Sequence, residues 1–285
     1  MIVKTILRLG LALGILAPAL GSGKAMAQGA SQTPPAVARL IAAADSLGSD
    51  GRAVAGLAID LAPGWKTYWR SPGEGGVAPE FDWSASVNLA AAEVRFPVPE
   101  RQVVGGVTSV VYPNSVILPI DVAAKDPTQP LRLSLVFRYG VCHDICVPRE
   151  DRLSLELPPG NGVPGAAAPA IQAAQALVPL PFAQAGLTLK KAWTTPGPKP
   201  TLKLSIEAAE PLTPGDILVE GPETVWFEQP QMAVPDVAPG GKGGTILASV
   251  PLGPAGAPEL LAGHTLTITV LAGPRSAETT VTLPK

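Results

Sequence analysis

Residues 131–157 read LRLSLVFRYGVCHDICVPREDRLSLEL, a stretch in which apolar side chains recur at every second position on both sides of two cysteines. In the first run the apolar set alternates with Arg132, Ser134, Val136 and Arg138, and its members are Leu131, Leu133, Leu135 and Phe137. A period of two indicates a strand with one buried face. Leu153, Leu155 and Leu157 repeat the pattern. The two runs predict a β-hairpin with Cys142 and Cys146 near its tip.

Short segments typical of strands recur along the rest of the chain, with turn residues between them. They are Arg52–Leu61, Phe81–Trp83, Ala91–Phe96, Val107–Val111 and Val116–Val122 before the hairpin, and Leu187–Lys191, Leu202–Ala208, Ile217–Glu220, Thr245–Val250, His264–Val270 and Glu278–Leu283 after it. The 30 glycines and 33 prolines are many, but 46% of the residues are hydrophobic and only 15% are charged. Such a chain can bury a core, so we predict an all-β protein built from sandwiches.

The length and the punctuation of the chain predict two domains. We expect the first over residues 28–160 and a second, smaller sandwich over residues 182–285. Residues 161–181 form the predicted linker, and Ala166–Leu177 within it is rich in alanine, which predicts a short helix. Ala36–Ser46 also has helix-forming composition, with apolar residues at helical spacing, and a helix is expected there.

Residues 1–27 have the organisation of a secretory signal peptide. Lys4 and Arg8 form a basic start, an apolar run follows from Leu9 to Leu20, and the small-x-small triplet ends at Ala27. The alternative is an uncleaved anchor, but the apolar run is shorter than the roughly 20 residues of a membrane span. We expect cleavage after Ala27 and a mature chain outside the cytoplasm.

Removal of that segment with Lys4, Arg8 and Lys24 would change the formal net charge from −2 to about −5. This mild acidity argues against nucleic acid as a partner, because nucleic-acid binders carry clustered positive charge.

The Cys-x3-Cys pair is the one chemically distinctive site of the sequence. A disulfide across so short a loop constrains the unfolded chain little, so stapling the fold gains little from it. A working redox pair is therefore favoured over a structural bridge. A protonated His143 beside the cysteines would favour the reactive thiolate, whereas Asp144 would oppose it.

Other chemistries are open to the same two cysteines. Thiolates are suitable ligands for Cu(I), so a copper-binding or copper-tolerance protein is the main alternative. An interaction module with a purely structural disulfide is another. A closed zinc site is poorly supported by two cysteines and two histidines. A Cys–His hydrolase would need an orienting group that nothing in the sequence marks.

Four segments, read in order, resemble a known family. They are Gly64-Trp-Lys-Thr-Tyr-Trp-Arg-Ser-Pro-Gly73, Phe81-Asp-Trp83, Phe96-Pro-Val-Pro99 and Tyr139-Gly-Val-Cys142 with Cys146-Val-Pro148. Together they resemble the amino-terminal periplasmic domain of the thiol:disulfide interchange protein DsbD, and in particular its ScsB-like branch, which is linked to copper tolerance. The resemblance spans about residues 52–158.

The resemblance implies an immunoglobulin-like β-sandwich that works as one component of a protein-disulfide reductase, without a cofactor. Cys142 and Cys146 would take electrons from a membrane-embedded thiol reductase and reduce periplasmic thioredoxin-like proteins. Tyr68 falls where the family keeps an aromatic side chain near the cysteines, with Trp69 beside it. Residues 99–107 fall where the family has a loop that caps the pair.

The sequence departs from the family pattern in three ways. The spacing of the cysteines is shorter than in the best-known members. The capping segment offers Val103 and Val104 instead of aromatic side chains. No part of the 285 residues resembles the transmembrane electron carrier or the thioredoxin-like domain of the family, so we expect a separate membrane protein to supply electrons.

Overall fold

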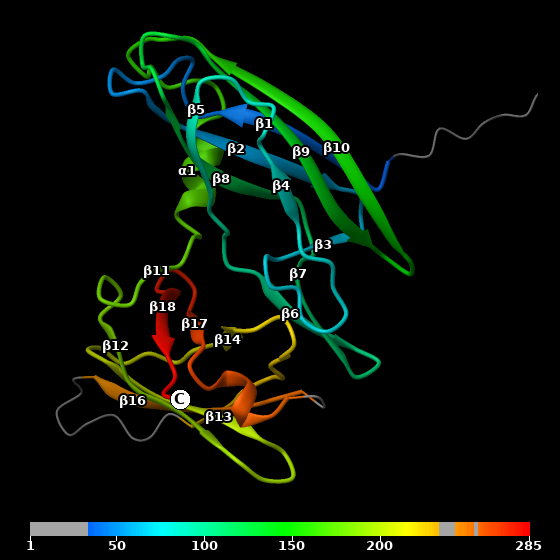
Figure 1. Cartoon of the computed structure of the whole chain (residues 1–285), viewed down its shortest axis with the longest axis vertical. Helices are drawn as coiled ribbons and strands as arrows, with labels where there is room; N and C mark the ends of the chain where they lie inside the picture. The colour runs from blue at the N-terminus through cyan, green and yellow to red at the C-terminus, as the bar shows by residue number, and fades with distance from the viewer. Residues whose placement is uncertain (1–33, 234–242, 254–255) are drawn as a thin grey trace, which may run out of the picture. The chain divides into compact units, whose positions relative to one another are not determined.

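The computed structural model describes residues 34–233, 243–253 and 256–285. The predicted signal peptide lies outside the described residues. Residues 34–285 form one compact unit, and strands dominate it (Figure 1). Within the described ranges, no helix combines the length and the apolar character that a membrane span requires.

The first domain is a sandwich of two sheets. One sheet has the order β1-β2-β8-β5, with β1 (Ala36–Ala42), β2 (Arg52–Leu61), β8 (Val116–Ala124) and β5 (Leu89–Val94). The other has the order β10-β9-β3-β7-β6, with β4 also paired to β9; its strands are β10 (Cys146–Leu157), β9 (Leu131–Cys142), β3 (Lys66–Tyr68), β7 (Val107–Tyr112), β6 (Glu100–Val104) and β4 (Glu80–Asp82). The predicted all-β sandwich is confirmed.

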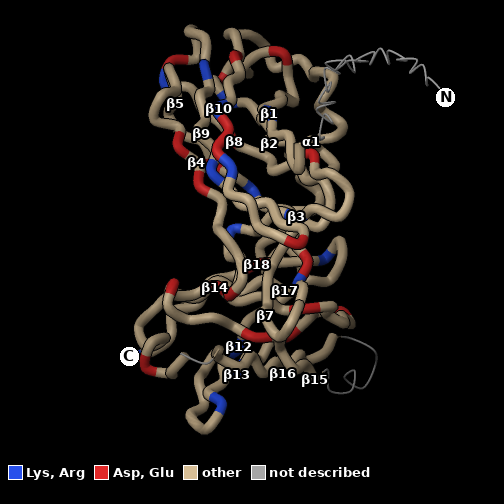
Figure 2. The backbone as a smooth tube through the Cα atoms, turned by 90° about the vertical axis from the view of Figure 1, so that its right-hand side faces the viewer, with Lys and Arg blue, Asp and Glu red and all other residues tan. Residues whose placement is uncertain are grey.

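The predicted hairpin is confirmed and extends over all of β9 and β10. Its register runs from Leu131 opposite Leu157 to Cys142 opposite Cys146. The leucines and Phe137 of β9 are buried in the core between the sheets, where the Phe137 ring stacks 4.2 Å from that of Tyr139. The outer face carries ion pairs of Arg132 with Glu156 and of Arg138 with Glu150, so charges of both signs alternate along the hairpin (Figure 2).

The helix predicted for Ala36–Ser46 is wrong, because residues 36–42 form the edge strand β1. All seven of its residues pair with β2, from Ala36 opposite Leu61 to Ala42 opposite Ala55. The helical spacing of Val37, Leu40 and Ile41 is a weak local signal, and pairing with a neighbouring strand outweighs it.

The predicted helix between the domains is α1 (Ala168–Gln175). Its Ile171 is fully buried and packs on Gly56 of β2, where an added Cβ would lie 3.2 Å from Ile171 Cγ1. This cover explains why the β2 face that carries Gly56 and Ala58 is buried as well as the opposite face.

The second domain is a further sandwich of two four-stranded sheets. The first is ordered β11-β18-β17-β14, with β11 (Leu180–Pro181), β18 (Ala277–Thr282), β17 (Thr265–Leu271) and β14 (Asp216–Glu220). The second is ordered β12-β13-β16-β15, with β12 (Leu187–Thr195), β13 (Thr201–Ala208), β16 (Gly244–Pro251) and β15 (Gln231–Ala233). A short 3-10 helix, η1, spans Pro258–Leu261. The inward faces of these strands form a separate apolar core.

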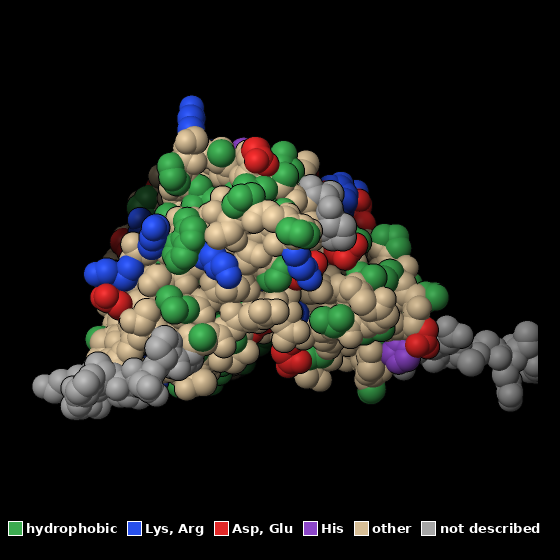
Figure 3. All heavy atoms as spheres, turned by 90° about the horizontal axis from the view of Figure 1, so that it is seen from below, with side chains coloured by type: hydrophobic (Ala, Val, Ile, Leu, Met, Phe, Trp, Pro, Cys, Tyr) green, Lys and Arg blue, Asp and Glu red, His purple; other side chains and the backbone are tan. Residues whose placement is uncertain are grey.

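The fold class of two immunoglobulin-like β-sandwiches is therefore confirmed, whereas the domain boundaries stay predictions. On the face of the molecule in Figure 3, apolar side chains lie scattered among polar ones and backbone. Single exposed apolar side chains are normal for a folded protein and mark no site by themselves.

Candidate functional site

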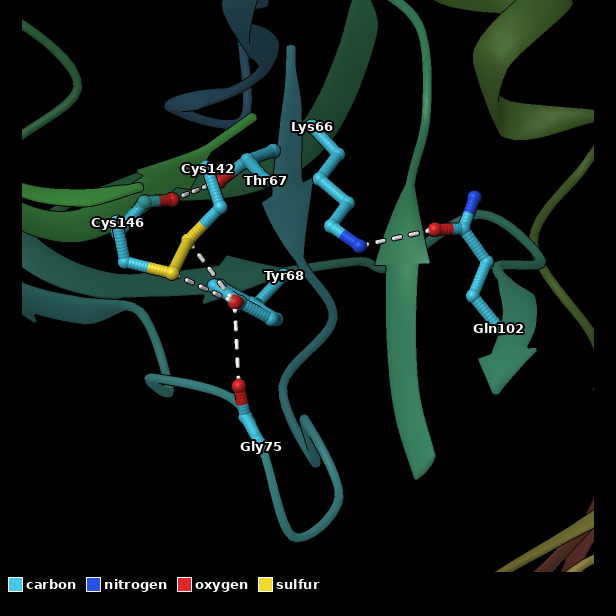
Figure 4. Close-up of a disulfide and its surroundings, with 8 residues drawn as sticks. Lys66, Thr67, Tyr68, Gly75, Gln102, Cys142 and Cys146 are labelled. Atoms are coloured by element: carbon cyan, nitrogen blue, oxygen red, sulfur yellow. Dashed lines mark hydrogen bonds between the residues drawn. A yellow bond between two sulfur atoms is a disulfide. The ribbon is translucent and has the colours of Figure 1, made fainter. Parts of the chain in front are cut away.

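Cys142 and Cys146 are joined by a disulfide at the tip of the β9–β10 hairpin (Figure 4). The amide of His143 donates to the carbonyl of Ile145 at 3.1 Å, so the cysteines occupy the next, non-hydrogen-bonded pair of the ladder. Opposed Cα atoms approach most closely in such pairs, and the two lie 4.1 Å apart. Cys142 is only 1% exposed, whereas Cys146 is exposed. Of the two cysteines, Cys146 is therefore the one that a partner from solvent can approach.

Tyr68 lies directly against the disulfide, as the resemblance implied. It ends β3, which pairs with β9 on one side and β7 on the other. Its hydroxyl oxygen is 3.0 Å from Cys142 Sγ, 3.5 Å from Cys146 Sγ and 3.2 Å from the carbonyl oxygen of Gly75. Disulfide sulfurs carry no hydrogen, so the phenol is the donor, and its single proton serves either the sulfurs or Gly75. Burial raises the pKa of Tyr68, which keeps that proton in place.

Two glycines make room for the Tyr68 ring. A Cβ on Gly140 would lie 3.2 Å from Tyr68 Cε2, and a Cβ on Gly76 would lie 2.8 Å from Tyr68 Cδ1. No role was predicted for Gly76, and Gly140 was noted only as part of the segment that carries the family resemblance. A signal was available for Gly140, because an isolated glycine inside a strand often marks a close approach of another group.

Lys66 was likewise quoted without a role of its own. It is the direct cross-strand partner of Cys142, so both side chains emerge on the same face of the sheet. The Lys66 ammonium donates to Oε1 of Gln102 on β6 at 3.0 Å (Figure 4). A cation therefore lies on the face of the sheet that carries the disulfide.

His143, predicted as a supporting residue, lies in the loop between the cysteines and is half exposed. Its Nδ1 is 2.9 Å from Oδ2 of Asp144, and its ring centroid is 5.9 Å from that of Trp65. Gly64 accommodates the ring, because a Cβ there would lie 2.7 Å from Nε2 of His143. The imidazole is thus held by its neighbours in the loop and in the segment before β3.

Trp69 lies on the other side of the sheet from Tyr68, as alternation along an extended chain requires. It is buried in the core of the first domain. Val103 and Val104 end β6 and are 53% and 68% exposed. From this strand it is Gln102 that reaches a neighbour of the disulfide. The capping role of the two valines stays a prediction.

In the part of the chain that the structure describes, no group of three or more His, Cys, Asp or Glu side chains is arranged to hold a metal ion. The site consists of a disulfide with Cys146 exposed and a phenol hydroxyl 3.0 Å from the sulfur of the buried Cys142. That arrangement is suited to thiol–disulfide exchange.

Comparisons with known proteins agree with this chemistry. Residues 36–158 match the family model described as thiol:disulfide interchange protein DsbD, N-terminal. Residues 177–285 match a family described as a domain of unknown function (DUF8393). The comparison with curated proteins returned no match.

Among solved structures, the N-terminal periplasmic domain of ScsB from Proteus mirabilis is similar, with 26% identity and a TM-score of 0.66. The match covers 90% of this chain and 96% of that one, so it includes both sandwiches. The N-terminal domain of DsbD from Neisseria meningitidis in the reduced form also matches, with 17% identity, a TM-score of 0.25, and coverage of 44% of this chain and 86% of that one. The second likeness is too weak to carry an argument.

Proposed function

Because residues 36–158 form a DsbD N-terminal domain of the ScsB-like kind, we propose that this protein relays electrons by thiol–disulfide exchange. The proposed donor is a membrane-embedded thiol reductase, and the proposed acceptors are thioredoxin-like proteins of the periplasm. The observation that carries the proposal is a disulfide with Cys146 exposed and Cys142 buried under Tyr68. The periplasmic location is supported by the predicted signal peptide and by the description of the matched domain.

Electron uptake begins at Cys146, because a thiolate must reach the sulfur that it attacks. The donor thiolate attacks Sγ of Cys146, the disulfide breaks, and Cys142 leaves as a thiolate. A second donor thiolate then attacks the donor sulfur of the mixed disulfide. The donor departs as a disulfide and Cys146 is released as a thiolate, so two electrons have entered the pair.

Electron delivery is the same path in reverse. The Cys146 thiolate attacks the disulfide of an acceptor and forms a mixed disulfide with it. The Cys142 thiolate then attacks Sγ of Cys146, the disulfide of the pair re-forms, and the acceptor leaves as a dithiol after proton uptake. Ile145, next to Cys146, is an exposed apolar side chain, which suits contact with the acceptor around the reacting sulfur.

Tyr68 assists both directions, because Cys142 is a thiolate in each. Its hydroxyl lies at hydrogen-bonding distance from Cys142 Sγ, and a hydrogen bond to the charged form of a thiol favours that form. A thiolate that is better stabilised is also a better leaving group.

Trapping with single cysteine variants tests the proposal. In Cys142→Ser the exposed thiol of Cys146 can attack but nothing resolves the mixed disulfide, so a covalent complex with an oxidised periplasmic thioredoxin-like protein should accumulate. Cys146→Ser is the matched control, because it also keeps one thiol, the buried one, and should trap much less. Absence of a mixed disulfide with either variant would contradict the exchange function.

Copper binding is the alternative proposal for the same pair. Once reduced, Cys142 and Cys146 would present two thiolates, which suit Cu(I). Titration of the reduced protein with Cu(I) tests it. One equivalent bound by the natural chain and lost in Cys142→Ser, together with no trapped partner, would replace electron relay by copper binding as the function.

A further inference from the structure

Strand β14 of the second domain packs one of its two faces against the first domain. Ile217 and Val219 pack in the core of the second domain. Leu218, which points the opposite way, belongs to the core of the first domain. Asp216 and Glu220 share the Leu218 face, since side chains alternate along a strand. Both carboxylates bind arginines of the first domain. Glu220 binds Arg70, two residues after Tyr68, and Asp216 binds Arg101 of β6.

Glu220, at one end of this face, binds Arg70 in the segment that carries Tyr68. Arg70, two residues after Tyr68, donates from Nε at 3.0 Å to Oε2 and from its terminal nitrogen at 2.7 Å to Oε1 of Glu220. Glu278 of β18 accepts from the same guanidinium, and the hydroxyl of Thr269 donates to Glu278 at 3.1 Å. Burial alone would lower the pKa of Arg70, but the two carboxylates outweigh it and raise the pKa. The guanidinium is thus fixed in a paired and hydrogen-bonded position.

Asp216, at the other end of the face, binds Arg101 of β6. Arg101 donates from Nε to Oδ2 of Asp216 at 2.7 Å and from a terminal nitrogen to the carbonyl of Ile217 at 3.0 Å. The two side chains are only 6% and 15% exposed. The neighbouring residue on β6 is Gln102, whose Oε1 accepts from the ammonium of Lys66, and Lys66 is the cross-strand partner of Cys142. Burying an ion pair costs desolvation that an apolar contact would avoid, so such a pair contributes to register more than to net stability.

We propose that β14 is a positioning strand for the redox pair, and that the second domain uses it to keep Cys142 covered. The outward face of β14 fixes the positions of β6 and of the Tyr68–Arg70 segment through Asp216, Leu218 and Glu220. Tyr68 then stays on the sulfur of Cys142, and only Cys146 meets solvent. The inference extends the proposed function, because it assigns the second domain a task in the exchange, but the covering of Cys142 can be measured without any partner.

The experiment uses the chain from residue 28 onward with a single cysteine, in the Cys146→Ser background, and follows alkylation of Cys142 by iodoacetamide across pH. The quantity compared is the plateau rate above the pKa of the thiol, because only the thiolate reacts and a shift of that pKa then does not affect the rate. The variant Glu220→Gln/Glu278→Gln neutralises both partners of Arg70. We expect alkylation of Cys142 to become at least about tenfold faster, because the loss of even one charge-assisted hydrogen bond corresponds to a factor of about ten or more. Alkylation of Cys146, measured in the Cys142→Ser background, should be unchanged.

Ile268→Val is the matched control, since Ile268 is fully buried in the core of the second domain and its truncation destabilises that domain without touching β14's outer face. An equal rise in Cys142 alkylation with Ile268→Val would overturn the inference, as would no rise with the double variant. Should the double variant fail to fold, Glu220→Gln alone leaves Glu278 on Arg70 and should give a smaller rise in the same direction. Iodoacetamide needs no partner, so failure of trapping and failure of this inference are separate results.

Discussion

Replacing Tyr68 by Phe removes the one hydroxyl that lies on the buried sulfur. In the reduced protein, the structure predicts that this hydroxyl donates to the Cys142 thiolate across the 3.0 Å that separates it from Sγ. A hydrogen bond to a charged group contributes about 1.5–3 kcal/mol, and about 1 kcal/mol is lost because the proton leaves the carbonyl of Gly75. The remaining difference of about 0.5–2 kcal/mol corresponds to roughly 0.4–1.5 pKa units. Tyr68→Phe should therefore raise the pKa of the Cys142 thiol by about one unit.

The assay is the ultraviolet absorbance of the thiolate followed against pH in the Cys146→Ser background, where Cys142 is the only thiol. Tyr112→Phe is the matched control, because it also removes a buried phenol hydroxyl. That hydroxyl donates to the carbonyl of Pro97 at 2.7 Å, inside the core. It should leave the Cys142 pKa unchanged. The reasoning is refuted if Tyr68→Phe also leaves that pKa unchanged, or if both variants shift it equally.

Three further predictions concern the scaffold of the site. Phe137→Ala should lower the free energy of unfolding by about 3–5 kcal/mol, since the fully buried ring leaves a cavity between the sheets, as denaturant unfolding can measure. Gly73→Ala should lower the free energy of unfolding, again measured with denaturant, by about 1–2 kcal/mol or more. The residue has a φ of 79°, and its new Cβ would lie 2.7 Å from the carbonyl oxygen of Thr108. Burial raises the pKa of Tyr112 well above 10.0, so the unfolded chain alone loses this proton in alkali and stability should fall as pH rises past about 10. Tyr112→Phe should remove that part of the slope, and an unchanged slope would contradict it.

Sequence reasoning found the hairpin because its evidence is local. Alternation over Leu131–Tyr139 and Leu153–Leu157 predicts two strands, and the short segment between them predicts how they pair. The same locality failed at Ala36–Ser46, where helix composition was read but the deciding interaction is pairing with β2. An edge strand of this kind is recognisable only once its neighbour is known.

The environment of the disulfide was only half predictable. Tyr68 came from a family resemblance, not from any pattern in the residues themselves. The roles of Gly140 and Lys66 depend on the register between β3 and β9, strands that are far apart in the chain. The outer face of β14 was equally hidden, because Asp216 and Glu220 on a short strand read as an ordinary solvent-exposed face until Arg101 and Arg70 are placed against them.

The pairing of Cys142 with Cys146 across a tight hairpin also bears on the order in which the molecule assembles. Adjacent strands close only a short loop, so the hairpin can form early and bring the two sulfurs together by itself. The contact of Tyr68 with Cys142 spans 74 residues and must wait until β3 docks. The two thiols therefore come into contact before Tyr68 packs against Cys142. A newly exported chain would pass through a stage in which both sulfurs are open to oxidants, and its first oxidation would need no help from the finished fold.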